Sequence, residues 1–367
     1  FERRSSRTEH VASSDAVHVL NAGERRALWS VTRNAVVRAA LAGAASSVIA
    51  GAAEVFANDT VGEHAPAAQQ NAIEFWAIVI TFTVIAAVAE IAYLYWDTLR
   101  SVHELSRQAG LELFHGKRDD DQMVATVLAR AALELPNPLE NRWGINPRRE
   151  SSRWKLLAAS LLYKAKVGIT NFLFKALIRR MMARVLLRQT LANLLPFLAV
   201  PVTAAWNGYV CWRVMREARL RAMGPSAIKE LVKKLFADHA ELDDAGRLAA
   251  LRAVAAAIVR TQDLHPNLAT LFDAVAEHAK YEGKEELDDP GQFLRSLSGL
   301  SEQNQRLAIQ VLGIACIVDG QLARKEKLLW AEALAAAGRP VELSRLEKLC
   351  REFVRGDGLA DEAVRSL

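Results

Sequence analysis

Few residues of this chain have the type and spacing for chemistry. Asp319 and Glu326 stand seven residues apart in "IACIVDGQLARKEKLL" (314–329), and two carboxylates at a turn are suitable ligands for a hard cation. Glu90 stands inside an apolar segment, where an ionisable side chain is costly and normally has a partner or a function. The chain contains no P-loop, dinucleotide-binding, zinc-protease or serine-hydrolase motif, so we expect no enzyme and no cofactor.

The Asp-Gly turn has two interpretations. A calcium loop supplies several oxygens over twelve residues, whereas Asp319 and Glu326 are the only acids between 314 and 329. Three cations crowd the same turn: Arg324, Lys325 and Lys327. We therefore expect Asp319 to close one helix, Gly320 to adopt a positive φ, and Glu326 to lie in the first turn of the next helix. A metal site at Asp319 and Glu326 is the alternative.

Two apolar segments, 39–57 and 75–96, fill a gap between Arg38 and Arg100 that contains no Lys or Arg. Each has about the length that a helix needs to cross ~30 Å of hydrocarbon. Trp and Tyr flank the second segment at both ends, as membrane interfaces favour. The pattern predicts a two-helix transmembrane hairpin over 39–96, with two buried helices of a soluble bundle as the alternative.

The flanks of this hairpin set its orientation. Arg residues precede the first segment and follow the second, whereas the connecting loop has acids and no Lys or Arg. The positive-inside rule then places both outer flanks, and both termini, on the cytoplasmic side of the membrane. The three cysteines form no paired motif, and we expect buried thiols in a reducing compartment.

Polar and small residues within the apolar segments are the candidate site. Glu90 either handles a proton or ion, or makes a structural hydrogen bond or ion pair, for which Arg38 is a candidate partner. Glu54 is expected near the outer interface. Small residues at a spacing of four form a stripe on the first segment that allows close helix packing, on the second segment or on another copy of the chain. The stripe contains Gly43, Ser47 and Gly51.

Between the hairpin and the C-terminal region lies a basic, apolar stretch (154–224). Five cations of its first part are interleaved with apolar residues, namely Lys175, Arg179, Arg180, Arg184 and Arg188. A basic amphipathic helix suits the surface of an anionic bilayer, and we prefer this to nucleic acid because no RNA-binding motif accompanies it. Residues 190–215 are apolar and contain Pro196 and Pro201, which favours a broken re-entrant hairpin whose backbone Asn207 could satisfy. A single third span is the alternative.

From residue 225 onward the pattern is that of a soluble, all-α domain. Pro266 and Pro290 are expected at helix starts and Gly338 at a helix end. The segments 247–268 and 306–328 also share a pattern, which predicts two similar helix-turn-helix pairs.

Two stretches resemble known families. The run "RRMMARVLLRQ" followed by "LLPFLAVPVTAAWN" looks like the membrane-associated helical region of EcsC-like bacterial proteins. The run "IACIVDGQLARKEKLLWAEALAAAG" resembles TerB-like domains, small all-α modules named from tellurite-resistance operons. The TerB-like mark is an Asp-Gly, an aliphatic residue and a Glu, here Asp319, Gly320, Leu322 and Glu326. This resemblance implies a metal-sensing or protein-interaction module linked to membrane stress.

Together these patterns predict an all-α protein with five regions. They are a basic cytoplasmic segment (1–38), a transmembrane hairpin (39–96), a cytoplasmic helix and loop (97–153), embedded or re-entrant basic helices (154–224) and a TerB-like cytoplasmic bundle (225–367). We expect a non-enzymatic bacterial inner-membrane protein that presents an interaction or sensing module. Its expected partners are anionic lipids, further copies of itself or a membrane-protein complex, and an unknown protein that binds the C-terminal domain. The alternative is a homo-oligomeric ion channel or transporter that uses Glu90.

Overall fold

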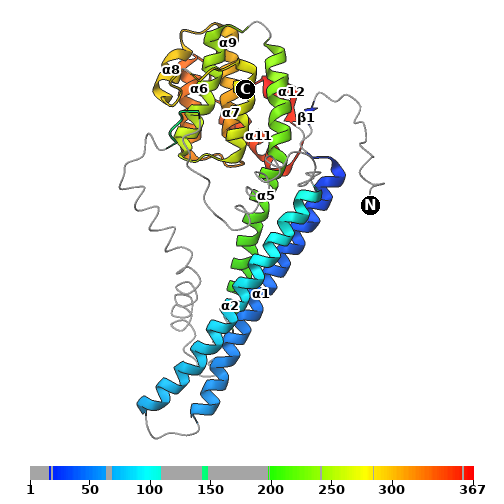
Figure 1. The fold of residues 1–367 in the computed structure, drawn as a ribbon, viewed down its shortest axis with the longest axis vertical. Coiled ribbons are helices and arrows are strands. Elements are labelled where there is room, and N and C mark those ends of the chain that lie inside the picture. Colours follow the sequence, from blue (N-terminus) through cyan, green and yellow to red (C-terminus); the bar gives the residue numbers. More distant parts are fainter. Residues whose placement is uncertain are drawn as a thin grey trace. The chain divides into compact units, whose positions relative to one another are not determined.

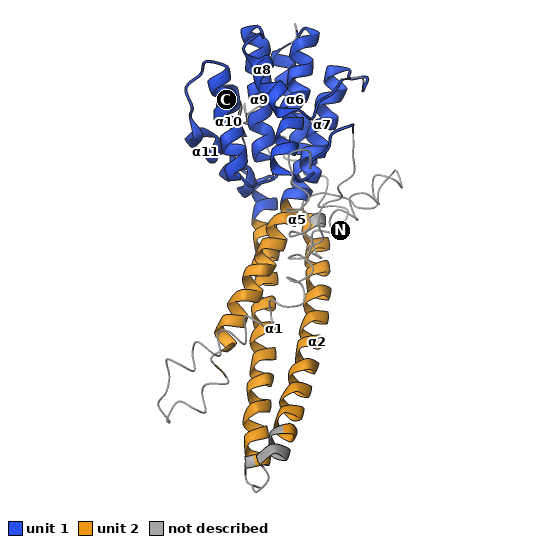
Figure 2. Cartoon of the chain, turned by 90° about the vertical axis from the view of Figure 1, so that its left-hand side faces the viewer, with its two compact units in different colours: residues 1–25, 136–150, 220–367 blue, residues 26–135, 151–219 orange. Residues whose placement is uncertain are grey.

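The computed structural model describes nine stretches of the chain, namely residues 16–17, 20–62, 68–108, 143–147, 197, 199–239, 242–283, 285–357 and 359–367. Within these stretches the chain is helical apart from one pair of two-residue strands. It divides into two compact units, drawn in different colours in Figure 2. The first unit combines residues 1–25, 136–150 and 220–367, and the second combines residues 26–135 and 151–219.

Most of the described part of the second unit consists of two long helices, α1 (Ala22–Gly62) and α2 (Ala68–Gln108), which run in opposite directions (Figure 1). Each has 41 residues and is therefore about 60 Å long. Both are long and apolar enough to cross a membrane by length and composition. Only 33% of the apolar window of α1 and 17% of that of α2 is buried, whereas the core helix of a soluble bundle would be mostly buried.

The third long helix, α5 (Ala199–Asp238), is continuous, so the part of the expected broken hairpin (190–215) that the structure describes has no break. Pro201 lies in its first turn, where the missing N–H of proline would have no helical partner in any case, so the chain does not break there. Pro225 lies inside α5, and the first unit begins at residue 220, so the expected domain boundary at 225 falls within a helix. The preceding basic residues 154–196 lie outside the described part of the chain.

The first unit is a helical bundle whose centre is α6 (Asp244–Thr261) packed against α9 (Glu302–Ile317). Two helix-turn-helix pairs result, α6 with α7 (Pro266–Ala279) and α9 with α10 (Arg324–Ala336), as the shared sequence pattern predicts. The bundle also contains α8 (Pro290–Leu297), α11 (Leu343–Arg355) and α12 (Asp361–Arg365) (Figure 1).

Local signals for the ends of these helices work as expected. Pro266 and Pro290 are the first residues of α7 and α8, which confirms both predicted starts. Gly338, with φ +68°, follows the C-cap of α10 and confirms the predicted helix end. At the start of α6 the Asp243 carboxylate accepts a hydrogen bond from the backbone N–H of Gly246 at 2.7 Å.

An N-terminal strap, which we define as residues 16–25, belongs to the same unit as the C-terminal helices. Its strand β1 (Ala16–Val17) pairs antiparallel with β2 (Leu359–Ala360). Leu20 is 4% exposed, and Arg25 forms an ion pair with Asp357. The strap is therefore part of the C-terminal bundle, although the sequence suggested a separate segment over 1–38.

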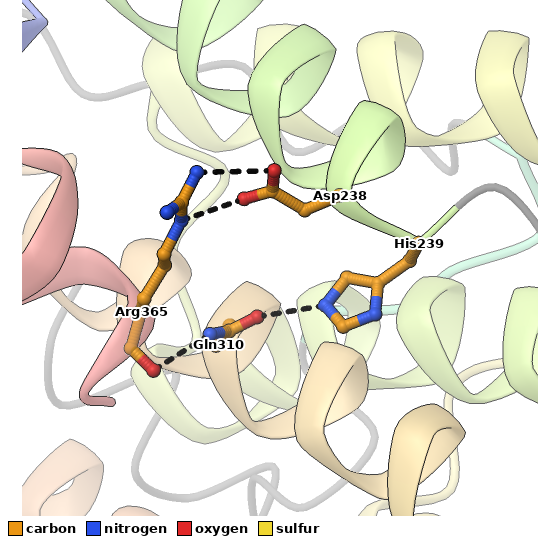
Figure 3. A network of polar contacts seen from close by, with 4 residues as sticks. All are labelled: Asp238, His239, Gln310 and Arg365. Carbon is orange, nitrogen blue, oxygen red and sulfur yellow. Dashed lines mark hydrogen bonds and ion pairs between the residues drawn. The ribbon is translucent and has the colours of Figure 1, made fainter. Parts of the chain in front are cut away.

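A polar network fastens the last helix of the chain to the end of α5 (Figure 3). The Arg365 guanidinium contacts both carboxylate oxygens of Asp238, at 2.9 and 3.1 Å. The Gln310 side chain donates to the backbone oxygen of Arg365 at 3.0 Å and lies 3.2 Å from Nε2 of the buried His239. Gln310 thus joins α9, α12 and the end of α5 with one amide group.

Candidate functional site

The second unit contains a line of buried polar contacts, which we call the polar seam and define by Arg38, Ser47, Glu90, Asp97, Ser101, Thr203 and Asn207. Its central contact joins α2 to α5. The Asn207 side chain donates a hydrogen bond to Oε1 of Glu90 at 2.6 Å. Glu90 is 6% exposed and Asn207 is 7% exposed. A buried carboxylate is costly without a donor, so this amide stabilises Glu90 in its apolar surroundings.

A second contact of the seam joins α1 to α5. The hydroxyl groups of Ser47 and Thr203 lie 2.5 Å apart, within hydrogen-bond distance, and Thr203 also lies 3.1 Å from the carbonyl oxygen of Gly43. Close approach of the two helices requires a glycine here. A Cβ on Gly43 would lie 2.6 Å from Nδ2 of Asn207 and 2.9 Å from the backbone oxygen of Thr203. At Gly43 and Ser47 the small-residue stripe therefore faces α5, whereas the sequence predicted packing on α2 or on another copy of the chain.

The third contact of the seam is a salt bridge between α1 and α2. Nε of Arg38 donates to Asp97 at 2.7 Å, and Nη2 of Arg38 donates to the hydroxyl of Ser101 at 2.9 Å. Asp97 and Ser101 are 3% and 2% exposed. Arg38 thus neutralises a buried carboxylate with hydrogen-bonded geometry, and the partner that the sequence suggested for it, Glu90, bonds to Asn207 instead.

Large apolar side chains surround the seam on the outside. On α2 these include Ile85 and Val88, both more than 60% exposed. Others are Leu41, Ile49 and Phe56 on α1, Ile80, Phe82 and Val84 on α2, and Tyr209 and Trp212 on α5. This arrangement, with polar side chains inside and apolar side chains outside, is the reverse of that in a water-soluble bundle. It is the arrangement expected of helices surrounded by lipid hydrocarbon.

Aromatic residues stacked under Arg mark one end of the apolar surface. The guanidinium of Arg33 lies 5.0 Å from the ring centre of Trp29 on α1, and that of Arg100 lies 5.5 Å from Trp96 on α2. Tryptophan with a nearby cation is favoured at the level of lipid headgroups. Both pairs lie at the helix ends for which the sequence predicts the cytoplasmic interface.

The remaining predicted residues of this region have simpler positions. Gly51 is buried on α1, and Glu54 is half-buried towards the C-terminal end of the same helix. The five predicted membrane-surface cations, Lys175, Arg179, Arg180, Arg184 and Arg188, lie outside the described residues. Sequence reasoning missed Asp97, Ser101 and Thr203. The sequence did contain a signal for Asp97. It directly follows the second apolar segment, and Arg38 directly precedes the first, so the hairpin brings the two side chains to the same end.

The Asp-Gly turn lies in the first unit, between α9 and α10. Oδ1 of Asp319 accepts from the backbone N–H of Gln321 at 2.8 Å, and Gly320 has φ +71°. Oε2 of Glu326 accepts from the N–H of Ala323 at 2.7 Å, in the manner of a capping box. Asp319 thus shapes the turn, and Glu326 stabilises the start of α10.

The Glu326 side chain is fully buried, and its Oε1 has no hydrogen-bond partner among the described residues. Burial, and to a lesser extent the charge of Asp319, raise the pKa of the Glu326 carboxyl to about 9, although the hydrogen bond from the Ala323 N–H lowers it. Glu326 is therefore a neutral acid at pH 7.

A metal ion would need more ligands than this turn assembles. In the described part of the chain no three His, Cys, Asp or Glu side chains gather in a way that could hold a metal. The metal site at Asp319 and Glu326 stays a prediction, and its test is Ca²⁺ or Mg²⁺ binding that is lost in Asp319→Ala. Cys211, Cys316 and Cys350 are free and buried, as the sequence predicts.

Comparison with known proteins adds no relative. No model of a known protein family matches the chain, and no curated protein or solved structure is similar enough to indicate a relationship. The TerB-like and EcsC-like resemblances therefore stay predictions that depend on short motifs.

Proposed function

We propose that this chain is a non-enzymatic protein of the bacterial inner membrane that presents its C-terminal helical bundle, as an interaction or sensing module, at the cytoplasmic surface. The observation that carries the proposal is the arrangement of α1, α2 and the start of α5, with polar contacts inside and large apolar side chains outside. In a bilayer this arrangement buries the seam in protein and leaves the apolar side chains to lipid.

The rest of the proposal follows from sequence. The basic flanks place both termini in the cytoplasm, and the cations over 175–188 contact anionic lipids. The bundle, TerB-like in sequence, binds a protein partner or responds to envelope stress. The hairpin assembles with further copies or with another membrane protein.

Membrane topology tests this proposal with two single-cysteine probes, because the three native cysteines are buried. Asp59, exposed near the end of α1, is replaced by Cys, and so is Lys348, exposed on α11. In spheroplasts, a membrane-impermeant maleimide should label Asp59→Cys and should label Lys348→Cys only after the membrane is opened. The unaltered chain is the background control. Equal labelling of both variants in intact spheroplasts, or recovery of the chain without membranes, contradicts the proposal.

The burial of Glu90 supports a second candidate function, passage of protons or ions through a homo-oligomer. Flux into proteoliposomes containing the purified chain, abolished by Glu90→Gln and retained by Glu54→Gln, would favour this function. Absence of flux in the unaltered chain would leave the Glu90–Asn207 hydrogen bond as a packing contact.

A further inference from the structure

A short stretch from the middle of the chain, residues 143–147 (Trp-Gly-Ile-Asn-Pro), lies on the C-terminal bundle. It belongs to the first unit, while the residues on both sides of 136–150 belong to the second. The Trp143 ring lies 4.5 Å from the ring of Phe272 on α7, with an angle of 35° between the two planes. The bundle therefore holds a segment that is more than 100 residues away in sequence from the helix that it contacts.

The segment contacts the bundle as a peptide ligand would. Ile145 is 2% exposed and Pro147 is buried, whereas Gly144 and Asn146 between them are exposed. Trp143 and Gly144 form a turn, and after it the buried Ile145 and Pro147 alternate with the exposed Asn146, a pattern by which a short peptide segment is recognised through side-chain contacts. The backbone N–H of Asn146 donates to Oδ2 of Asp288 at 3.3 Å, which fixes the position of the segment along the surface.

The receiving surface combines the end of α7 with the loop that leads to α8. Phe272 is fully buried, and the edge of the Tyr281 ring packs against it at 6.4 Å. Leu287 and Asp288 in the loop are 3% and 8% exposed. We call Phe272, Tyr281, Leu287 and Asp288 the docking face. It offers aromatic and aliphatic contacts and one carboxylate that accepts a backbone N–H.

The backbone of the segment is held in an unfavourable shape. Trp143 has φ +56° and Gly144 has φ +76°. A left-handed conformation is uncommon for a bulky non-glycine residue and persists only where contacts over-determine it. The contact with Phe272 must therefore offset the conformational strain of Trp143. Because release of residues 143–147 from the bundle relieves this strain, the segment is easier to displace than one bound without strain.

We propose that the docking face is a recognition surface for short segments of the form aromatic-x-aliphatic-x-proline that begin with a turn, and that residues 143–147 occupy it as an internal ligand that a partner segment displaces. This inference deepens the proposed interaction role of the bundle and rests on it. The internal ligand keeps the face covered until a segment with the same chemistry competes for it.

The experiment uses the full chain in detergent and a fluorescein-labelled peptide of residues 141–149, followed by fluorescence anisotropy. In the variant Trp143→Ala/Ile145→Ala the docking face is open, so the peptide should bind at least tenfold more tightly than it binds to the unaltered chain, where the internal ligand competes. Adding Asp288→Ala to this variant should weaken binding. A matched peptide with Ala at both apolar positions should not bind to either protein.

Two results overturn the inference: no peptide binding by the opened variant, or equal binding by the opened variant and the unaltered chain. If the opened variant does not fold, hydrogen exchange of the unaltered chain decides. The Ile145 and Asn146 amides should then exchange at least a hundredfold faster than the core amides of α9. Equal protection would show that residues 143–147 are a permanent part of the core, which overturns the inference. If the peptide does not bind but the cysteine labelling gives the expected topology, only the docking inference fails and the proposed membrane role stands. If the labelling contradicts the topology but the peptide binds as expected, the docking inference stands and the membrane role fails.

Discussion

At the scale of single residues, three of the buried carboxyl groups, those of Glu90, Asp97 and Glu326, are accommodated in three different ways. Glu90 accepts a hydrogen bond from an amide, and Asp97 forms an ion pair with a guanidinium. Glu326, with its second oxygen unpartnered among the described residues, retains its proton instead. The first two solutions join helices within the second unit, whereas the third makes the first unit sensitive to pH.

The sign of this sensitivity follows from the raised pKa. Unfolded, the Glu326 carboxyl titrates near its ordinary value of 4.5, and folded it titrates near 9. Between these values unfolding releases a proton, so stability is fully present below pH 4.5 and is lost as the pH rises towards 9. The free energy of unfolding should fall by at most about 1.4 kcal/mol per pH unit in this window. Melting temperatures of the full chain at pH 6 and pH 8.5 measure the slope.

Glu326→Gln should remove most of that slope, since its amide cannot ionise. The matched control is Glu347→Gln, because the hydrogen bond from Lys327 lowers the pKa of the exposed Glu347. A lowered pKa adds stability that is lost only in acid, so this control should leave the slope between pH 6 and 8.5 unchanged. An unchanged slope in Glu326→Gln would show that the carboxyl is ionised in the folded chain.

At the scale of elements, the close contact of α1 with α5 depends on Gly43. Gly43→Val would place a branched side chain against the Thr203 backbone, which cannot move aside as a flexible side chain can. We expect a loss of about 1–3 kcal/mol, the range for overpacked sites, with loss of the Ser47–Thr203 hydrogen bond. Thermal unfolding in detergent measures it. Ala45→Val, at an exposed position on the same helix, is the control and should change little.

These elements also show what a sequence can and cannot predict. The apolar segments 39–57 and 75–96 revealed the middles of α1 and α2 but not their ends, because both helices continue into polar and charged residues that an apolar pattern does not detect. Pro201 led to the wrong prediction of a break in the helix. A proline in the first turn of a helix and a proline that breaks a helix cannot be told apart until the start of the helix is known.

The candidate site divides in the same way. The sequence singled out Glu90 and Asn207 separately, since a polar residue in an apolar segment is conspicuous by itself. It did not pair them, because they are 117 residues apart and their contact depends on how three helices pack. Thr203, which looks ordinary in sequence, becomes part of the seam only through its neighbours on α1.

At the scale of the whole molecule, two compact units predict two unfolding transitions. Leu20→Ala removes most of a buried side chain of the N-terminal strap. It should lower the free energy of unfolding of the first unit by about 2 kcal/mol, and with it the midpoint temperature of that unit's transition. Gly43→Val should lower only the other, and the double variant should show both effects added. Differential scanning calorimetry in detergent measures both midpoints. A single transition that both variants shift equally would mean that the units unfold together.

The strap has a final consequence, for the order in which the protein is made. Arg25 and Asp357, which form its ion pair, are 332 residues apart. At a synthesis rate of 5–20 residues per second, the ribosome needs roughly 15–70 seconds after making the strap to produce its partner. The first helix thus leaves the ribosome, and under the proposed function enters the bilayer, long before residues 16–25 can pair. The bundle can complete its fold only after residues 357–360 have been synthesised and can meet the strap.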